Sequence, residues 1–118
     1  MVDVAGVDRS EVTGAWVLDL DGVVWLGEVA IPGSVDAIND LLDAGVEVTF
    51  CTNNSSATIE SFERALGAIG VDADGRVVSS ATAVADLVRP MERVLVCGGP
   101  GVRESMALSG ARIVPADT

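Results

Sequence analysis

The sequence predicts an α/β fold, a three-layer, Rossmann-like parallel sheet flanked by helices. Short apolar runs rich in β-branched residues alternate with segments whose apolar residues recur at helical spacing, and the connections between them are short. Strands and helices that alternate in this way form parallel sheets covered by helices. With 118 residues, 49% of them hydrophobic, the chain has enough apolar surface for one core. We therefore assign residues 15–118 to a partial α/β core domain and residues 1–14 to an N-terminal arm.

The first half of the chain gives the clearest elements. A strand is expected over residues 15–20, because the run AWVLDL is too short for a helix and ends at aspartates. Pro32-Gly33-Ser34 then opens a helix that ends at Gly45, a residue suited to the left-handed position after a helix. The alternating run over residues 46–51 predicts the next strand. The later elements are expected as helix 59–69, strand 77–78, helix 81–88, strand 94–97, helix 101–109 and strand 112–114.

The first strand also predicts that this fold is incomplete. A run as apolar as Trp16-Val17-Leu18 belongs in the middle of a parallel sheet, with a neighbouring strand on each side. Doubly wound folds usually supply the second neighbour from later in the chain. Either the fold is unusually compact, or the 118 residues correspond to the front portion of a larger fold; we favour the second, with later core strands absent.

Composition excludes several classes of function. The net charge of −11 disfavours binding to a phosphate backbone, and without histidine no Ser-His-Asp machinery can form. No apolar run approaches the roughly 20 residues of a membrane span, and the first 14 residues do not resemble a signal peptide. Cys51 and Cys97 lie in apolar segments and are expected to be buried thiols. These features predict a cytoplasmic protein with no nucleic-acid or membrane partner.

Polar residues follow the first two predicted strands. Asp19-Leu20-Asp21-Gly22 ends the first strand, and Thr52-Asn53-Asn54 ends the second. The carboxyl ends of parallel strands face one crevice, where α/β folds bind their ligands. Two carboxylates separated by one residue favour a divalent cation, and a hydroxyl with amide donors at a helix start suits a phosphate.

These motifs carry a family resemblance. VLDLDGVVWLG, followed by PGSVDAINDLLDAGVEVTFCTNNSS, resembles the opening of the haloacid dehalogenase (HAD) superfamily phosphatases, in particular the 4-nitrophenylphosphatase-like, NagD-type branch (subfamily IIA). The likeness runs from about Ala15 to the end of the chain and would cover the N-terminal portion of such an enzyme. The two motifs are specific in combination, whereas either alone would be a weak signal.

The resemblance implies a role for each motif residue. Asp19 would attack phosphorus and form an aspartyl-phosphate, and Asp21 would serve as general acid and base. Thr52 and the amide of Asn53, with Asn54 and Gly22 nearby, would hold the phosphoryl oxygens. Asp19 and Asp21 would also bind the Mg²⁺ cofactor. The implied activity is magnesium-dependent hydrolysis of a small phosphorylated metabolite.

The sequence departs from this family in three respects. It contains no lysine to steady the phosphoryl charge, no later acidic motif to complete the magnesium site, and no substrate-selecting cap domain after the second motif. We expect half an active site, and an isolated chain that is inactive or only weakly active.

Each of these motifs also has an alternative interpretation in which its residues are purely structural. The acids at 19 and 21 are also typical of a turn, and residues 52–54 of a helix cap. A second D-x-D-G, at 72–75, precedes a strand and is interpreted as a solvated turn, and Gly98–Gly101 as a tight turn instead of an anion cradle. Trp25 is placed in a short flap near the aspartates, and Trp16 in the core.

A different class of function remains open. The chain could be a non-catalytic, HAD-like interaction module that forms a homo-oligomer through its unfinished sheet edge. A two-component receiver domain is disfavoured because receivers carry their phosphoacceptor after a middle strand and use a lysine, which this chain lacks.

Overall fold

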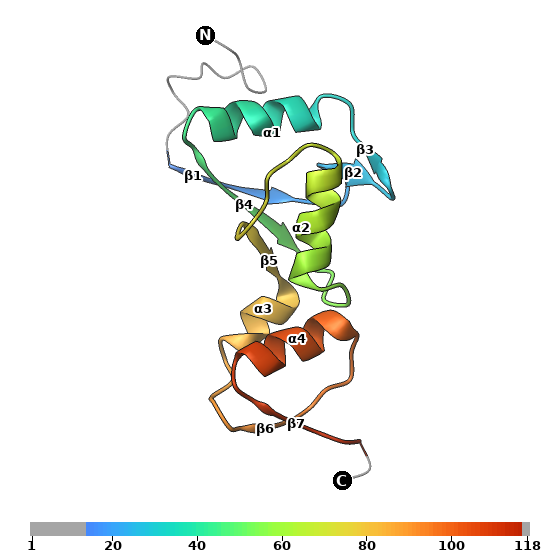
Figure 1. Ribbon diagram of the computed structural model, residues 1–118, viewed down its shortest axis with the longest axis vertical. Coiled ribbons are helices and arrows are strands. Elements are labelled where there is room, and N and C mark those ends of the chain that lie inside the picture. Colours follow the sequence, from blue (N-terminus) through green and yellow to red (C-terminus); the bar gives the residue numbers. More distant parts are fainter. Residues whose placement is uncertain (1–13, 117–118) are drawn as a thin grey trace. The chain divides into compact units, whose positions relative to one another are not determined.

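The computed structural model describes residues 14–116 (Figure 1). All but the last residue of the predicted N-terminal arm thus lies outside the described residues. The described chain forms two compact units. The first comprises the residues up to Cys51 together with Glu63–Val77, and the second comprises Thr52–Phe62 together with the residues from Val78 onward.

The α/β class predicted from the sequence is confirmed. A parallel sheet has the strand order β1-β4-β5 and is flanked by helices. Its elements and their connecting helices are β1 (Ala15–Asp19), α1 (Ser34–Asp43), β4 (Glu47–Thr52), α2 (Ile59–Ala68) and β5 (Val77–Ser79). β1 and β4 are in parallel register, with Asp19 opposite Cys51. Gly45 has φ 77° directly after α1, in the left-handed region that its sequence position predicts.

Alternation along β1 and β4 separates a buried face from an exposed one. Val48 and Phe50 of β4 are 1% and 0% exposed, and they form the centre of the core of the first unit. Val17, on the other face of β1, is 69% exposed. Cys51 shares the β4 face that points away from Val48 and Phe50, which is why it is exposed. The prediction of a buried Cys51 is therefore wrong, and the same holds for Cys97, which is exposed beyond the last strand residue before it.

β1 lies at the edge of the sheet formed by the described residues, in agreement with the unfinished sheet edge expected from the sequence. Within the described residues its strand neighbour is β4. Trp16 is half-buried instead of fully enclosed, which fits an edge position. The exposed Val17 and the edge position of β1 are features that a partial α/β core would show.

The second unit contains a sheet of its own. Its elements beyond residue 79 are α3 (Ser80–Ala85), β6 (Arg93–Leu95), α4 (Pro100–Leu108) and β7 (Arg112–Val114). β6 and β7 pair in parallel as a separate two-stranded sheet, and α4 contacts both α3 and β7. α3 is shorter than predicted. It begins with a capping box between Ser79 and Thr82, and Asp86 is its C-cap.

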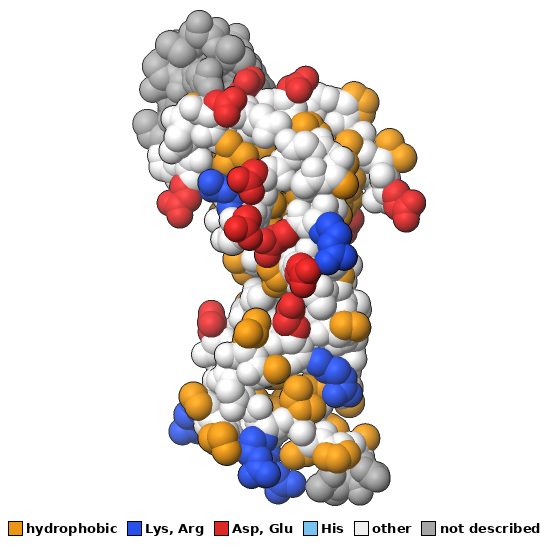
Figure 2. Space-filling model, viewed as in Figure 1, with side chains coloured by type: hydrophobic (Ala, Val, Ile, Leu, Met, Phe, Trp, Pro, Cys, Tyr) orange, Lys and Arg blue, Asp and Glu red, His pale blue; other side chains and the backbone are white. Residues whose placement is uncertain are grey.

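Charge is distributed unevenly between the units. Acidic side chains gather over the surface of the first unit, whereas the visible part of the second unit bears several arginines (Figure 2). The arginines of the second unit are Arg89, Arg93, Arg103 and Arg112. None of the helices within residues 14–116 has the length and apolar character needed to traverse a lipid bilayer.

Candidate functional site

A tight turn at the carboxyl end of β1 holds the two predicted catalytic aspartates. The carbonyl oxygen of Leu20 accepts hydrogen bonds from the amides of Val23, Val24 and Trp25, at 3.3, 2.9 and 3.3 Å. Leu20 is 1% exposed and anchors the turn in the core, while Asp19 and Asp21 on either side of it are exposed. The motif therefore folds so that its apolar residue is buried and both carboxylates face solvent.

Gly22 allows this turn to form. It has φ 83°, a conformation that residues with a Cβ rarely adopt, and its amide donates to the carbonyl oxygen of Trp25 at 2.8 Å. The carboxylate of Asp19 accepts a hydrogen bond from the amide of Leu20 at 2.8 Å, a contact that limits the rotation of this side chain. Asp19 is thus held by its own turn.

The predicted flap is a β-hairpin. β2 (Trp25–Leu26) and β3 (Val29–Ala30) pair antiparallel directly after the acidic turn. The indole Nε1 of Trp25 donates to Oδ1 of Asp21 at 3.0 Å. This hydrogen bond links the hairpin to the second aspartate and orients its carboxylate.

Residues 52–54 form a second polar turn, at the end of β4. The side-chain oxygen of Thr52 accepts from the amide of Asn54 at 3.1 Å, and Thr52 is 3% exposed. Because the hydroxyl is used as an acceptor here, its proton remains available for donation to an anion. Asn53 and Asn54 are exposed.

The strand register aligns the ends of β1 and β4, but it does not determine how the two polar turns beyond them lie relative to each other. Asp19 is opposite Cys51, and Thr52 follows Cys51 as the last residue of β4. The boundary between the two units lies between Cys51 and Thr52. The aspartates belong to the first unit and residues 52–54 to the second, so their convergence on one phosphate remains a prediction.

The acidic pair suits magnesium by the chemistry of its donors. Carboxylate oxygens are the ligands Mg²⁺ prefers, and one or two of them, completed by water and substrate phosphate, make a common site. Within residues 14–116, no three or more Cys, Asp or Glu side chains are grouped closely enough to hold a metal ion. The donor chemistry of Asp19 and Asp21 is compatible with Mg²⁺, and their role as magnesium ligands stays a prediction.

The second D-x-D-G, at 72–75, forms an exposed turn, in agreement with its interpretation from sequence. The amide of Asp74 donates to the carboxylate of Asp72 at 3.3 Å, and that of Gly75 to Glu63 of α2 at 3.3 Å. Ala73 is 2% exposed and anchors the turn, whereas both aspartates are exposed.

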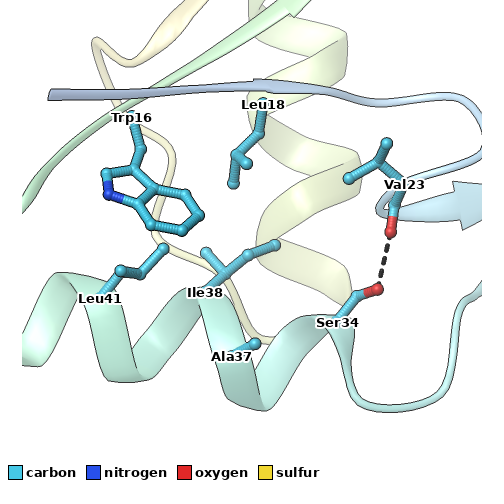
Figure 3. Close-up of a pocket in the computed structure, with 7 residues that line it drawn as sticks. All are labelled: Trp16, Leu18, Val23, Ser34, Ala37, Ile38 and Leu41. Atoms are coloured by element: carbon cyan, nitrogen blue, oxygen red, sulfur yellow. Dashed lines mark hydrogen bonds between the residues drawn. The ribbon is translucent and has the colours of Figure 1, made fainter. Parts of the chain in front are cut away.

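The first unit also contains an apolar pocket. Trp16 and Leu18 of β1 point toward Ile38 and Leu41 of α1 around a cavity of about 140 Å³ (Figure 3). At one end the hydroxyl of Ser34 donates to the carbonyl oxygen of Val23 at 2.7 Å. No carboxylate is among its lining residues, so this pocket is unsuited to the predicted chemistry.

Comparison with known proteins defines the class of the chain. Residues 16–112 match the haloacid dehalogenase-like hydrolases, so the chain belongs to this family. Within it, the similarity is to the p-nitrophenyl phosphatase and NagD branch, which confirms the resemblance inferred from the two motifs.

Three relatives illustrate the extent of the similarity. The acid sugar phosphatase of Staphylococcus aureus is 33% identical over 100 residues, 81% of this chain and 39% of that one. The p-nitrophenyl phosphatase from Archaeoglobus fulgidus is 25% identical with a TM-score of 0.80, over 87% of this chain and 41% of that chain. A glycerol phosphate phosphatase from Mycobacterium tuberculosis, in complex with magnesium, is 30% identical with a TM-score of 0.73, over 86% and 32%. The chain thus spans about two fifths or less of the length of these relatives.

Proposed function

We propose that this chain carries the nucleophile-bearing part of a magnesium-dependent phosphomonoesterase active site. The observation that carries the proposal is the Asp19–Gly22 turn at the carboxyl end of β1, with both carboxylates exposed beside a buried Leu20. Ligand sites in parallel α/β sheets lie at this end of the strands. Membership in the hydrolase family supports the same assignment.

In the proposed reaction, a carboxylate oxygen of Asp19 attacks phosphorus and the bond to the leaving oxygen breaks. Asp21, protonated at this stage, gives its proton to that oxygen. Asp21 then accepts a proton from water, whose oxygen attacks the aspartyl-phosphate and releases inorganic phosphate and the free Asp19 carboxylate. A carboxylate is a weak nucleophile, so alignment by the turn accounts for much of its reactivity.

The remaining groups bind charge. The Thr52 hydroxyl and the backbone of residues 53–54, with Gly22, would hold phosphoryl oxygens, and the two aspartates would hold Mg²⁺. The bound cation would reduce the repulsion between the Asp19 carboxylate and the phosphate. Because the sequence has no lysine, a positive charge expected near the phosphate is not supplied by that residue type, and we propose weak activity for these 118 residues alone.

The proposed substrate class is a small phosphate monoester. The relatives are named for sugar, glycerol and nitrophenyl phosphates, all of them small phosphorylated compounds.

Manganese, a paramagnetic substitute for magnesium, tests the metal-binding part of the proposal. In NMR spectra of the 118-residue chain, low Mn²⁺ concentrations should broaden the amide signals of residues 19–22 well before those of residues 72–75, and Asp19→Asn with Asp21→Asn should remove this broadening. The chain supplies its own control in the second D-x-D-G turn. Equal broadening of the two turns, or broadening at 19–22 that survives both substitutions, would contradict the proposal.

An interaction module is the second candidate function, and the edge position of β1 favours it. Val17 is 69% exposed on a strand whose outer edge has no strand neighbour among the described residues. Two copies pairing along β1 would form a homodimer. Light scattering at several protein concentrations tests this proposal. A dimer that is lost in Val17→Lys would support it, and a wild-type chain that is monomeric at all concentrations would exclude it.

A further inference from the structure

The segment that carries the proposed phosphate-binding residues is held by helix α4. This segment, residues 52–58, joins β4 to α2 and is called the β4–α2 loop below. Part of its shape is local, because Oδ1 of Asn54 accepts from the amide of Ser56 at 3.0 Å, in addition to the contact between Thr52 and Asn54. Such short-range contacts shape the turn but do not fix its place in the unit.

Three hydrogen bonds from distant residues of the same unit supply that placement. The hydroxyl of Ser80 donates to the carbonyl oxygen of Asn53 at 3.1 Å. The amide of Gly101 donates to the carbonyl oxygen of Ser56 at 2.9 Å. Oε2 of Glu104 accepts from the amide of Ile59 at 3.0 Å. The loop is thus held near its beginning, at its middle and at its end.

Two glycines of the predicted 98–101 turn, Gly99 and Gly101, are explained by this contact. A Cβ on Gly101 would overlap the carbonyl oxygens of Ala57 and Ser55, and one on Gly99 would lie 3.0 Å from the carbonyl oxygen of Ser56. Backbone therefore packs against backbone where α4 begins. The close approach of α4 to the loop therefore explains why Gly99 and Gly101 lack a side chain, and a bound anion is not required to explain them.

Glu104 has a second effect at the same place. The first amides of a helix lack partners within it, and an acceptor that bears negative charge satisfies one of them and interacts favourably with the helix dipole. For α2 this acceptor comes from α4, 45 residues further along the chain. The start of α2 therefore has two acceptors: the hydroxyl of Thr58, which accepts from the amide of Ser61 at 3.1 Å, and the carboxylate of Glu104, which ties the end of the loop to α4.

We propose that Glu104 is a positioning residue for the phosphate-binding segment Thr52–Asn54, with Ser80 as a second anchor. This inference rests on the proposed function for the meaning of the segment, but its structural content is independent of it. Glu104 would act through Ile59 and the β4–α2 loop and would not itself touch the phosphate. Loss of its carboxylate would release one end of the loop and disorder the amides that are to bind phosphoryl oxygens.

The test compares Glu104→Ala with Glu104→Gln, which keeps a side-chain oxygen able to accept from Ile59. Glu47→Gln, at an exposed position of β4, is the matched control for the loss of one negative charge. The measurements are NMR titrations of the loop amides with inorganic phosphate and Mg²⁺, and the thermal midpoint of each variant. We expect Glu104→Ala to shift the signals of residues 53–59 and to weaken phosphate binding by about tenfold or more, and Glu104→Gln to recover most of both effects.

The outcomes separate the two proposals. If the signals of residues 53–59 stay in place in Glu104→Ala, or if Gln and Ala behave alike, the positioning role is overturned. If phosphate leaves the wild-type loop unaffected while Glu104→Ala still displaces it, the proposed function fails and the role of Glu104 in placing the loop stands. Should Glu104→Ala fail to fold, Ser80→Ala takes its place: displacement of Asn53 and Asn54 supports the anchoring, and unchanged signals refute it.

Discussion

The two D-x-D-G turns of the first unit differ in position and agree in local structure. In each, the residue between the aspartates is buried, Leu20 at 1% and Ala73 at 2%, and the aspartates are exposed. In each, the glycine has positive φ, 83° for Gly22 and 71° for Gly75. The first turn follows strand β1, whereas the second precedes strand β5.

This difference in position matters more than the motif itself. In a parallel sheet, the turn after one strand and the turn before another lie at opposite ends of the sheet, and ligands bind at the carboxyl end. The second turn also has its glycine amide bound by Glu63 of α2, while the first is joined to the flap through Trp25. The same four-residue pattern thus has a proposed catalytic role in one place and a structural role in the other.

The largest expected effect is on catalysis. Any magnesium-dependent hydrolysis of 4-nitrophenyl phosphate by the chain should fall to the uncatalysed rate in Asp19→Asn, because the attacking carboxylate oxygen is lost. Asp72→Asn should leave the rate unchanged. Release of 4-nitrophenolate measures both. Equal rates for Asp19→Asn and wild type would remove the distinction between the turns, and robust turnover by wild type would refute the expectation that half a site is insufficient.

The second-largest difference between the turns is expected in stability, when the buried residue of each turn is replaced by a smaller one. Leu20→Ala removes a large side chain from the core and should lower the free energy of unfolding by about 3 kcal/mol. Ala73→Gly removes one methyl group and should cost about 1 kcal/mol. Urea denaturation measures both values. A cost for Leu20→Ala below that of Ala73→Gly would show that the first turn is not anchored by its leucine.

The glycines should cost similar amounts. Gly22→Ala and Gly75→Ala each place a Cβ on a residue with positive φ, where no atom within 4 Å adds a clash, so each should cost about 1 to 2 kcal/mol. Denaturation curves test the equality. Mn²⁺ affinity distinguishes the positions, because only Gly22→Ala is expected to lower it.

The smallest effect is expected for the flap contact. Trp25→Phe removes the hydrogen bond to Asp21, and since this contact is exposed the cost in stability should be about 0.5 kcal/mol or less. Mn²⁺ binding should tighten slightly, because the indole no longer occupies a carboxylate oxygen. Weaker Mn²⁺ binding in this variant would instead show that the indole positions Asp21 for the metal.

Local sequence patterns predicted much of this fold. The apolar spacing of α1 and the glycine after it located that helix, and alternation located β4. The unfinished edge at β1 was anticipated from its apolar run, which calls for a strand neighbour on each side, whereas the described residues supply one, β4. The exposure of Cys51 was missed because the general tendency of cysteine to be buried was given more weight than alternation, which places it on the face away from Phe50.

Long-range contacts were beyond the reach of the sequence. The two polar turns were located from strand ends alone, because β-strand termination is a local property. The contacts of Ser80 and Glu104 with the β4–α2 loop join residues 27 and 45 positions apart and leave no periodic signal. The pairing of β6 with β7 as a separate sheet likewise depends on tertiary contacts that alternating patterns do not encode.

The exposed thiols offer an experimental opportunity. Cys51 belongs to the first unit and Cys97 to the second, and both are free. A pair of spin labels or fluorophores can therefore be attached, one to each unit, without altering a single residue. Distances measured between them, with and without phosphate, would report directly whether ligand binding changes the separation of the units.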